Sequence, residues 1–240
     1  MNISKFKKGA WKGTKLRPCG AVIVAAGTAS RMGGIDKVMA PLGGIPMILR
    51  TVRTFQNSDV IREIVIVTRE DLIRPIMKLC EGLNKVQAVI AGGETRQASV
   101  VKGLDALSGK IQLVAVQDGA RPLITKEVID RTVHAANHFY AAAPTVPVKD
   151  TIKVVRGGLV SETPERSTLQ AVQTPQVFDV DLLKAALFQA EKDGAQVTDD
   201  CSAVERLGMS VRTVMGDERN IKVTTPLDLK IAELFLEEMG

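Results

Sequence analysis

The sequence predicts an α/β fold in which helices cover both faces of a mostly parallel β-sheet. Its 240 residues include short apolar runs rich in β-branched side chains at 22–24, 64–67, 86–91 and 113–116. Runs without polar alternation are typical of strands that are buried on both faces. Segments with helical spacing lie between these runs, and this order predicts parallel strands joined by crossover helices. With 45% hydrophobic residues, the chain can bury one substantial core.

Helix signals occur at the expected places between the strands. Pro46 stands at the first position of a helical pattern, where its fixed φ is favourable. Thr125 has the side chain of a helix N-cap. The expected helices are 46–56, 73–79, one ending at about 107, 125–139, 181–192, one ending at about 207, and one ending at about 238, with further strands at 141–148 and 211–214.

A β-hairpin is expected after the strand 141–148. Residues 151–155 and 159–163 surround Arg156-Gly157-Gly158, which has the chemistry of a tight turn. A two-stranded hairpin is marginal in water by itself, so it needs a surface to pack on, and a second subunit would provide one. We therefore predict one domain, residues 19–240, with a protruding β-hairpin arm at about 148–166.

The first 18 residues differ in charge from the rest of the chain. They hold six basic residues and no acid. The whole chain has a formal net charge of +5, whereas the rest of the chain, with 26 basic and 27 acidic residues, has a net charge of −1. We interpret residues 1–18 as a basic, disordered tail, which has no apolar run long enough for a signal peptide or a membrane span. The charge of the body then argues against nucleic acid or a membrane as a partner.

The chain has three cysteines, Cys19, Cys80 and Cys201. Their number is odd, and their spacing fits neither a disulfide framework nor a metal site. They are expected to be reduced thiols, which predicts a cytoplasmic protein.

A loop of small residues after the first strand is predicted to bind a polyphosphate. Ala25, Ala26 and Gly27 let backbone N–H groups approach an anion closely. Arg31 adds a planar fork of donors, and Lys37 adds a mobile positive charge. The segment lacks the glycine spacing of a dinucleotide-binding loop, and no hydroxyl residue follows Lys37 as a P-loop requires.

A second loop, 91–99, is expected to form another wall of the same site. The carboxyl ends of parallel strands meet at one edge of a sheet, so this loop should lie beside the first one. Backbone groups near Gly93, the carboxylate of Glu94 and the hydroxyl of Ser99 are candidates for reading the edge of a pyrimidine base.

Asp118 is the candidate metal ligand. It follows a buried strand and precedes Arg121, and an acid in this place can steer a Mg²⁺–nucleotide. Lys222 lies in a β-like segment near the C-terminus and is a candidate third cation. Asp199 and Asp200 start a predicted helix, whose dipole explains two carboxylates there, so we assign them no catalytic role.

Eight motifs, each weak alone, occur in a specific order. They are Ala25-Ala26-Gly27…Arg31-Met32…Lys37, Ala91-Gly92-Gly93-Glu94, Asp118-Gly119-Ala120-Arg121-Pro122, Val148-Lys149-Asp150-Thr151-Ile152-Lys153, Glu165-Arg166-Ser167, Gln173-Thr174-Pro175-Gln176, Thr198-Asp199-Asp200 and Asn220-Ile221-Lys222-Val223-Thr224. The first resembles the loop of sugar-nucleotide pyrophosphorylases and related nucleotidyltransferases. Together, from about Cys19 onward, they resemble the 2-C-methyl-D-erythritol 4-phosphate cytidylyltransferases of the non-mevalonate isoprenoid route.

This resemblance implies a Rossmann-like fold and an enzyme that transfers CMP from CTP to 2-C-methyl-D-erythritol 4-phosphate, with Mg²⁺. It also implies a homodimer in which the arm places Thr151 and Arg166 in the site of the other subunit. On the CTP side, the resemblance implies that Arg31 and Lys37 stabilise charge on the α-phosphate and that Gly93, Glu94 and Ser99 select cytosine. On the acceptor side, it implies that Arg166 and Lys222 hold the acceptor phosphate and that Thr198 lies near this phosphate. The implied contacts to the polyol are Asp118, Arg121 and Thr151.

Three other functions stay open, and a nucleic-acid role resting on the basic tail is the weakest of them. A polyol-phosphate cytidylyltransferase acting on ribitol 5-phosphate would share the nucleotide loops, although Ser167-Thr168-Leu169 and Thr198-Asp199-Asp200 fit the methylerythritol enzymes better. A nucleotide-binding module without turnover would not need four cations. Ala29, Gln117 and the short spacing from Met32 to Lys37 depart from the family pattern and concern the phosphate site.

Overall fold

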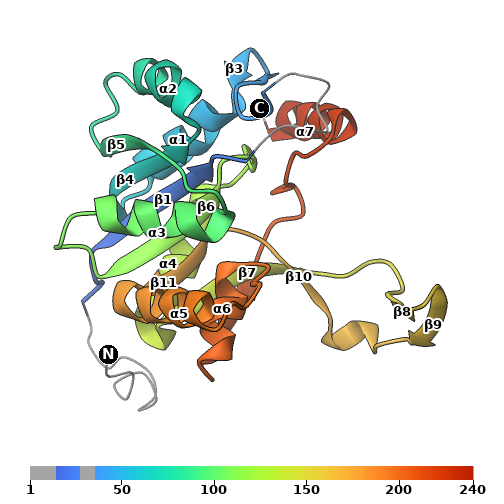
Figure 1. Cartoon of the computed structure of the whole chain (residues 1–240). Coiled ribbons are helices and arrows are strands. Elements are labelled where there is room, and N and C mark those ends of the chain that lie inside the picture. The colour runs from blue at the N-terminus through green and yellow to red at the C-terminus, as the bar shows by residue number, and fades with distance from the viewer. Residues whose placement is uncertain (1–14, 28–35, 240) are drawn as a thin grey trace.

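The computed structural model describes residues 15–27 and 36–239. Figure 1 shows a central sheet between helices, with an arm that projects away from it. The strands are β1 (Cys19–Ala25), β2 (Pro41–Leu42), β3 (Ile45–Pro46), β4 (Ile61–Thr68), β5 (Val86–Ala91), β6 (Leu113–Asp118), β7 (Ala141–Pro147), β8 (Val154–Arg156), β9 (Leu159–Glu162), β10 (Gln170–Val172), β11 (Gln176–Asp179) and β12 (Arg212–Met215). The helices are α1 (Met47–Asn57), α2 (Ile73–Leu79), α3 (Arg96–Ala106), α4 (Lys126–Phe139), α5 (Val180–Lys192), α6 (Asp200–Arg206) and α7 (Pro226–Met239), and short 3-10 turns lie at Glu70–Leu72 and Arg166–Thr168.

The strand order reverses beside β1. In the described part of the chain, the main sheet runs β10-β7-β11-β6-β1-β4-β5, and β12 pairs with β7. Strands β5, β4, β1 and β6 are parallel, whereas β11 is antiparallel to β6. The register pairs Val24 with Asp118. Ligands of such sheets bind at the carboxyl ends of the strands where the order reverses, so the topology places a site after β1 and β6.

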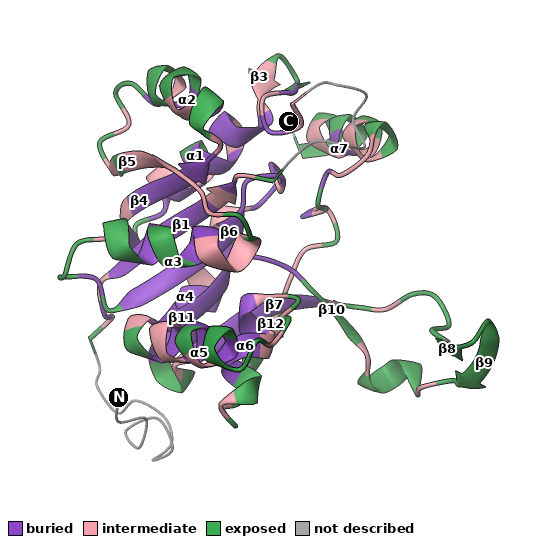
Figure 2. Ribbon diagram, viewed as in Figure 1, coloured by how far each residue is buried: buried purple, intermediate pink, exposed green. Residues whose placement is uncertain are grey.

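A layer of helices covers each face of the sheet, as predicted, and the sheet between the two layers consists mostly of buried residues (Figure 2). Helices α1, α2 and α4 contribute to one core cluster, and α3, α5 and α6 contribute to the other. In β6, residues 113 and 115 belong to the first cluster and 114 and 116 to the second. Because side chains alternate along a strand, Asp118 faces the α3 side and the buried Gln117 faces the opposite side. Gln117, which departs from the family pattern, therefore lies on the opposite face of the sheet from Asp118.

Most predicted elements are found within a residue or two of their predicted bounds. Thr125 caps α4 by accepting a hydrogen bond from the backbone N–H of Val128. In α6 the cap is Asp199, which accepts from the N–H of Ser202 and forms a capping box with it. Local chain chemistry thus sets these ends, in agreement with the sequence patterns.

The predicted arm is present as an isolated hairpin. Strands β8 and β9 pair only with each other among the described strands, and Figure 1 shows them at the end of a projecting segment. Gly157 and Gly158 connect them with φ of 57° and 80°, values that favour glycine in a two-residue turn. Residues 151–153 were predicted to extend the first strand, but the ladder begins only at Val154.

The predicted tail boundary is wrong at its last residues. Arg17 is only 6% exposed, and its guanidinium pairs with Asp179 at 2.8 Å. It also donates hydrogen bonds to the backbone carbonyls of Ala136 and Asn137 at the end of α4. A buried charge is tolerated when it is paired in this way, so Arg17 belongs to the folded body. Residues 1–14, with Trp11, lie outside the described residues.

The three cysteines are free and buried. Burial raises the pKa of the Cys80 thiol to about 11 and also raises the pKa of the Cys19 and Cys201 thiols. Among the residues described, no helix has both the length and the apolar composition needed to cross a membrane.

Candidate active site

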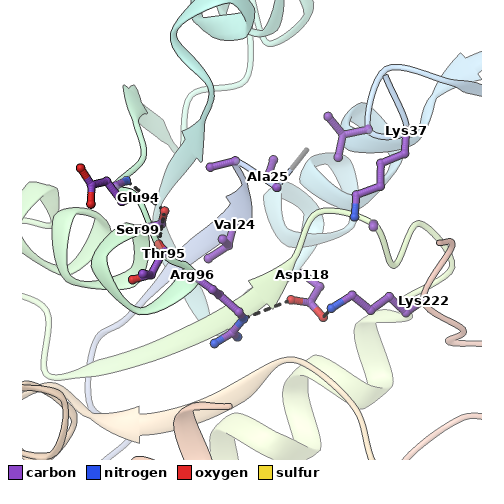
Figure 3. Close-up of a pocket in the computed structure, with 14 residues that line it drawn as sticks. Val24, Ala25, Lys37, Glu94, Thr95, Arg96, Ser99, Asp118 and Lys222 are labelled. Atoms are coloured by element: carbon purple, nitrogen blue, oxygen red, sulfur yellow. Dashed lines mark hydrogen bonds and ion pairs between the residues drawn. The ribbon is translucent and has the colours of Figure 1, made fainter. Parts of the chain in front are cut away.

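A cavity of about 290 Å³ lies at the carboxyl ends of β1 and β6. Figure 3 shows the residues that line it, which come from both strand ends, from the loop before α3, from α3 itself and from the segment before α7. Nine predicted site residues line it: Ala25, Ala26, Gly27, Lys37, Gly93, Glu94, Ser99, Asp118 and Lys222. The cavity therefore joins segments from four parts of the sequence.

The first wall is the loop after β1. An ideal Cβ placed on Gly27 would lie 3.9 Å from Lys37 Nζ, so the ammonium group of Lys37 lies close to the small-residue loop. This arrangement puts one mobile cation beside closely approachable backbone, which suits a phosphate group. Arg31, the other predicted cation of the loop, lies outside the described residues, as does Ala29.

The second wall is the turn between β5 and α3. An added Cβ on Gly92 would lie 2.6 Å from the Cβ of Ala26, so only glycine lets the two loops pack this closely. The Ser99 hydroxyl accepts from the N–H of Gly93 at 3.1 Å and donates to the carbonyl of Thr95 at 2.9 Å. Ser99 therefore holds the turn in shape. Contact between Ser99 and a base stays a prediction.

The floor of the cavity is the carboxylate of Asp118. Lys222 Nζ lies 2.9 Å from Oδ2, Arg121 Nε lies 3.7 Å from Oδ2, and Arg96 Nε lies 3.7 Å from Oδ1. Burial tends to raise the pKa of Asp118, but Lys222, Arg96 and Arg121 together hold it below its ordinary value. Asp118 is thus ionised at neutral pH, in a ring of cations.

Two hydrogen bonds, one between backbone groups and one from a side chain, bring Lys222 to Asp118 although the two are distant in sequence. The N–H of Val223 donates to the carbonyl of Ala120 at 2.8 Å. Arg121 Nη1 donates to the carbonyl of Asn220 at 2.7 Å. These two contacts lie on either side of Lys222 and align the segment 220–223 with the loop after β6.

Of the predicted site residues that the structure describes, Arg121 lies beside Asp118 without lining the cavity, and three others lie away from it. Thr151 and Arg166 lie on the exposed arm, and Arg166 Nη1 donates to the carbonyl of Lys149 at 2.9 Å. Thr198 lies on a separate surface hollow with Ser202 and Arg206. None of these three residues is among the described residues that line the cavity.

Sequence analysis missed one charged residue of the cavity. Arg96, the first residue of α3, lines it and forms a 2.8 Å ion pair with Asp200. Asp200 is 1% exposed, so the helix dipole alone does not explain it, and that part of the interpretation is wrong. The position of Arg96, shortly after the glycine turn at 92–93, could have indicated from the sequence that it lies at the cavity. Its partner lies 104 residues away.

The described residues contain no group of three or more His, Cys, Asp or Glu that could hold a metal ion among themselves. Mg²⁺ is commonly held by one or two carboxylates together with substrate phosphates and water. Among the described residues that line the cavity, Asp118 is the buried carboxylate, and its place beside the small-residue loop fits a metal that enters with a nucleotide.

A small-residue loop, a facing glycine turn and a ring of cations at the switch point of a Rossmann-like sheet are typical of proteins that bind a nucleotide, among them the nucleotidyltransferases. The family described as "IspD: 2-C-methyl-D-erythritol 4-phosphate cytidylyltransferase" matches residues 19–238. The chain therefore belongs to that family.

Individual relatives agree with this assignment. The chain is 45% identical over 223 residues to the 2-C-methyl-D-erythritol 4-phosphate cytidylyltransferase of Symbiobacterium thermophilum, covering 92% of this chain and 94% of the relative. It is 43% identical over 223 residues to that of Caldanaerobacter subterraneus, covering 91% and 98%. The crystal structure of 4-diphosphocytidyl-2C-methyl-D-erythritol synthase from Anaerococcus prevotii superposes with a TM-score of 0.84 at 31% identity, covering 92% and 96%.

Proposed function

We infer that the protein transfers CMP from CTP to 2-C-methyl-D-erythritol 4-phosphate, giving 4-diphosphocytidyl-2-C-methyl-D-erythritol and pyrophosphate in isoprenoid precursor synthesis. Family membership over residues 19–238 is the observation that carries this conclusion. The cavity agrees with it, because it joins the small-residue loop and Lys37 to Asp118 and Lys222.

The reaction is a displacement at phosphorus. A phosphate oxygen of the acceptor forms a bond to the α-phosphorus of CTP, the bond from that phosphorus to the bridging oxygen breaks, and pyrophosphate leaves with the electron pair. Catalysis of this kind depends on positioning and charge stabilisation. Lys37, beside the loop, stabilises charge on the α-phosphate, and Lys222 holds the acceptor phosphate. Arg31 is proposed to act with Lys37.

Mg²⁺ is the proposed cofactor, held by the phosphates of CTP with Asp118 as the protein ligand. When bound, it neutralises phosphate charge. Asp118 suits this role because it is ionised and because its Oδ1, 3.7 Å from Arg96, is less tightly paired than Oδ2, 2.9 Å from Lys222. Removal of Mg²⁺ with EDTA should abolish turnover, and adding Mg²⁺ back should restore it.

A homodimer formed through the arm is proposed to complete the acceptor end of the site. The arm carries Thr151 and Arg166, which lie away from the cavity of their own chain, and it exposes the apolar side chains of Val155, Leu159 and Val160. Exposed apolar side chains grouped on one hairpin favour a protein partner. A second copy would bury them and bring Thr151 and Arg166 toward the acceptor, and Thr198 is proposed to lie near the acceptor phosphate. The free thiols support a cytoplasmic location.

The test is pyrophosphate release from CTP with each polyol phosphate in turn. We expect rapid release with 2-C-methyl-D-erythritol 4-phosphate and little with ribitol 5-phosphate or without an acceptor. Faster release with ribitol 5-phosphate would favour the other cytidylyltransferase. CTP binding without release in any mixture would favour a non-catalytic module.

A further inference from the structure

Arg96 lies between two carboxylates that come from distant parts of the fold. Its Nη2 is 2.8 Å from Asp200 Oδ2, and its Nε is 3.7 Å from Asp118 Oδ1. Figure 3 shows Arg96, Asp118 and Lys222 in a row along the floor of the cavity. A guanidinium group can serve two carboxylates at once because its donors lie in one rigid plane.

Asp118 is held from both sides in this arrangement. Arg96 faces Oδ1, whereas Lys222 and Arg121 face Oδ2. Rotation of a carboxylate about its last torsion has broad, shallow minima, so its neighbours must impose a direction. Lys222 already neutralises Asp118 at close range, and the longer contact with Arg96 therefore matters chiefly for orientation.

Asp200 holds Arg96 in place. It is almost completely buried, and its backbone N–H donates to Gln176 Oε1 at 3.1 Å. Gln176 lies on β11 opposite Val116 of β6, the strand that ends at Asp118. Asp200 is thus tied to the strand that carries Asp118, while it does not line the cavity in the part of the chain described. Burial raises the pKa of Asp200, and Arg96 opposes this rise.

We propose that Arg96 is a positioning residue, fixed by the buried carboxylate of Asp200, that orients Asp118 toward the acceptor polyol. The inference rests on the proposed function, because it concerns where the acceptor is placed. It gives Asp200 a role that its place at a helix start does not suggest. It also separates Arg96 from the cations that touch phosphate: Arg96 acts through Asp118.

The test compares Arg96→Gln, Asp200→Asn and the double variant with Asp105→Asn as a matched control. Asp105 also lies on α3 and forms an exposed ion pair with Lys184 at 2.9 Å. We expect each single variant to lower kcat/KM for the acceptor about 10- to 100-fold, with a smaller rise in the KM for CTP, because Asp118 is also the proposed ligand of the Mg²⁺ that is bound to CTP. The double variant should have about the same kcat/KM for the acceptor as the more impaired single variant, because both changes remove the same contact. The control should match wild type.

Three results would overturn the proposal. A KM for CTP that rises more in Arg96→Gln than kcat/KM for the acceptor falls, with a normal Asp200→Asn, would mean that Arg96 touches the nucleotide directly. Additive losses in the double variant would mean that the two residues act separately. Normal acceptor kinetics in Asp200→Asn, with wild type active, would exclude positioning and leave the proposed reaction standing. An inactive wild type would instead count against the reaction.

Thermal unfolding distinguishes positioning from a loss of fold. If Asp200→Asn lowers Tm strongly, Arg96→Lys decides, because it keeps a positive charge near Asp200. A lysine ammonium cannot face both carboxylates through separate donors, so positioning still predicts a raised acceptor KM. Wild-type kinetics in folded Arg96→Lys would show that charge alone suffices and would overturn the proposal.

Discussion

The loops that line the cavity and the arm both carry predicted site residues, but the fold holds them in different ways. Asp118 and Ser99 are buried, and backbone hydrogen bonds tie their loops to the sheet, as from Gly119 N–H to Val24 O at 2.8 Å. The arm is a two-stranded ladder whose Leu159 and Val160 are 76% and 60% exposed. The loops of the cavity are held by the buried core of the chain, whereas the arm leaves apolar side chains exposed.

This difference corresponds to the two substrates. The buried loops form the wall proposed for the nucleotide, and one chain suffices to build them. The arm carries Thr151 and Arg166, proposed for the acceptor, and an isolated hairpin is only marginally stable. The residues proposed for the nucleotide thus lie together within one chain, whereas two of those proposed for the acceptor, Thr151 and Arg166, lie on an arm that exposes apolar side chains.

Loss of the loop cation should have the largest effect. Lys37→Ala removes the charge beside the loop at Gly27, and losing one contact that stabilises transition-state charge typically lowers kcat about 10²–10³-fold. Initial rates of pyrophosphate release at saturating substrates measure this. Lys184→Ala, which removes an exposed cation on α5, is the control and should leave kcat unchanged. A Lys37→Ala enzyme within a few-fold of wild type would remove Lys37 from the chemistry.

Mixing two impaired variants should restore activity if the arm completes the other subunit's site. Arg166→Ala should weaken the acceptor more than CTP. In a mixed dimer with Lys37→Ala, one site collects both lesions and the other has none. After random exchange of equal amounts, about one quarter of the wild-type rate should return. Mass spectrometry checks the exchange. A mixture that exchanges but stays inactive would place both residues in one chain's site.

Polar substitutions at the arm should weaken the proposed dimer. They should lower the turnover rate only as a consequence of dissociation. Burying a Leu or Val side chain contributes about 1.5–3 kcal/mol, so Leu159→Ser with Val160→Ser should raise the dimer Kd at least about tenfold. Sedimentation velocity over a dilution series measures it. Phe188→Ser, at an exposed apolar residue of α5, is the matched control. An unchanged dimer in the arm variant would move the interface elsewhere.

Removing the tail should have the smallest effect on turnover. A chain that starts at Lys15 should keep the wild-type kcat and Tm. A chain that starts at Cys19 also loses Arg17 and leaves Asp179 without its buried partner, which should cost about 3–5 kcal/mol of unfolding free energy. Urea denaturation measures this, and Arg17→Met isolates the pair. A loss of kcat in the first truncation, with the fold intact by circular dichroism, would connect the tail to the site.

The sequence by itself determined the layered α/β fold, most element bounds, the glycine turn of the arm and nine of the fourteen residues that line the cavity. These features follow from local patterns: apolar runs, capping side chains and loops at strand ends, each written in neighbouring residues. Only the tertiary structure decided which distant charges meet. Arg96 with Asp200, Lys222 with Asp118 and Arg17 with Asp179 are pairs that strand order and helix packing bring together. An ion pair leaves no periodic pattern in the sequence, because its energy depends on burial and distance in space rather than on separation along the chain.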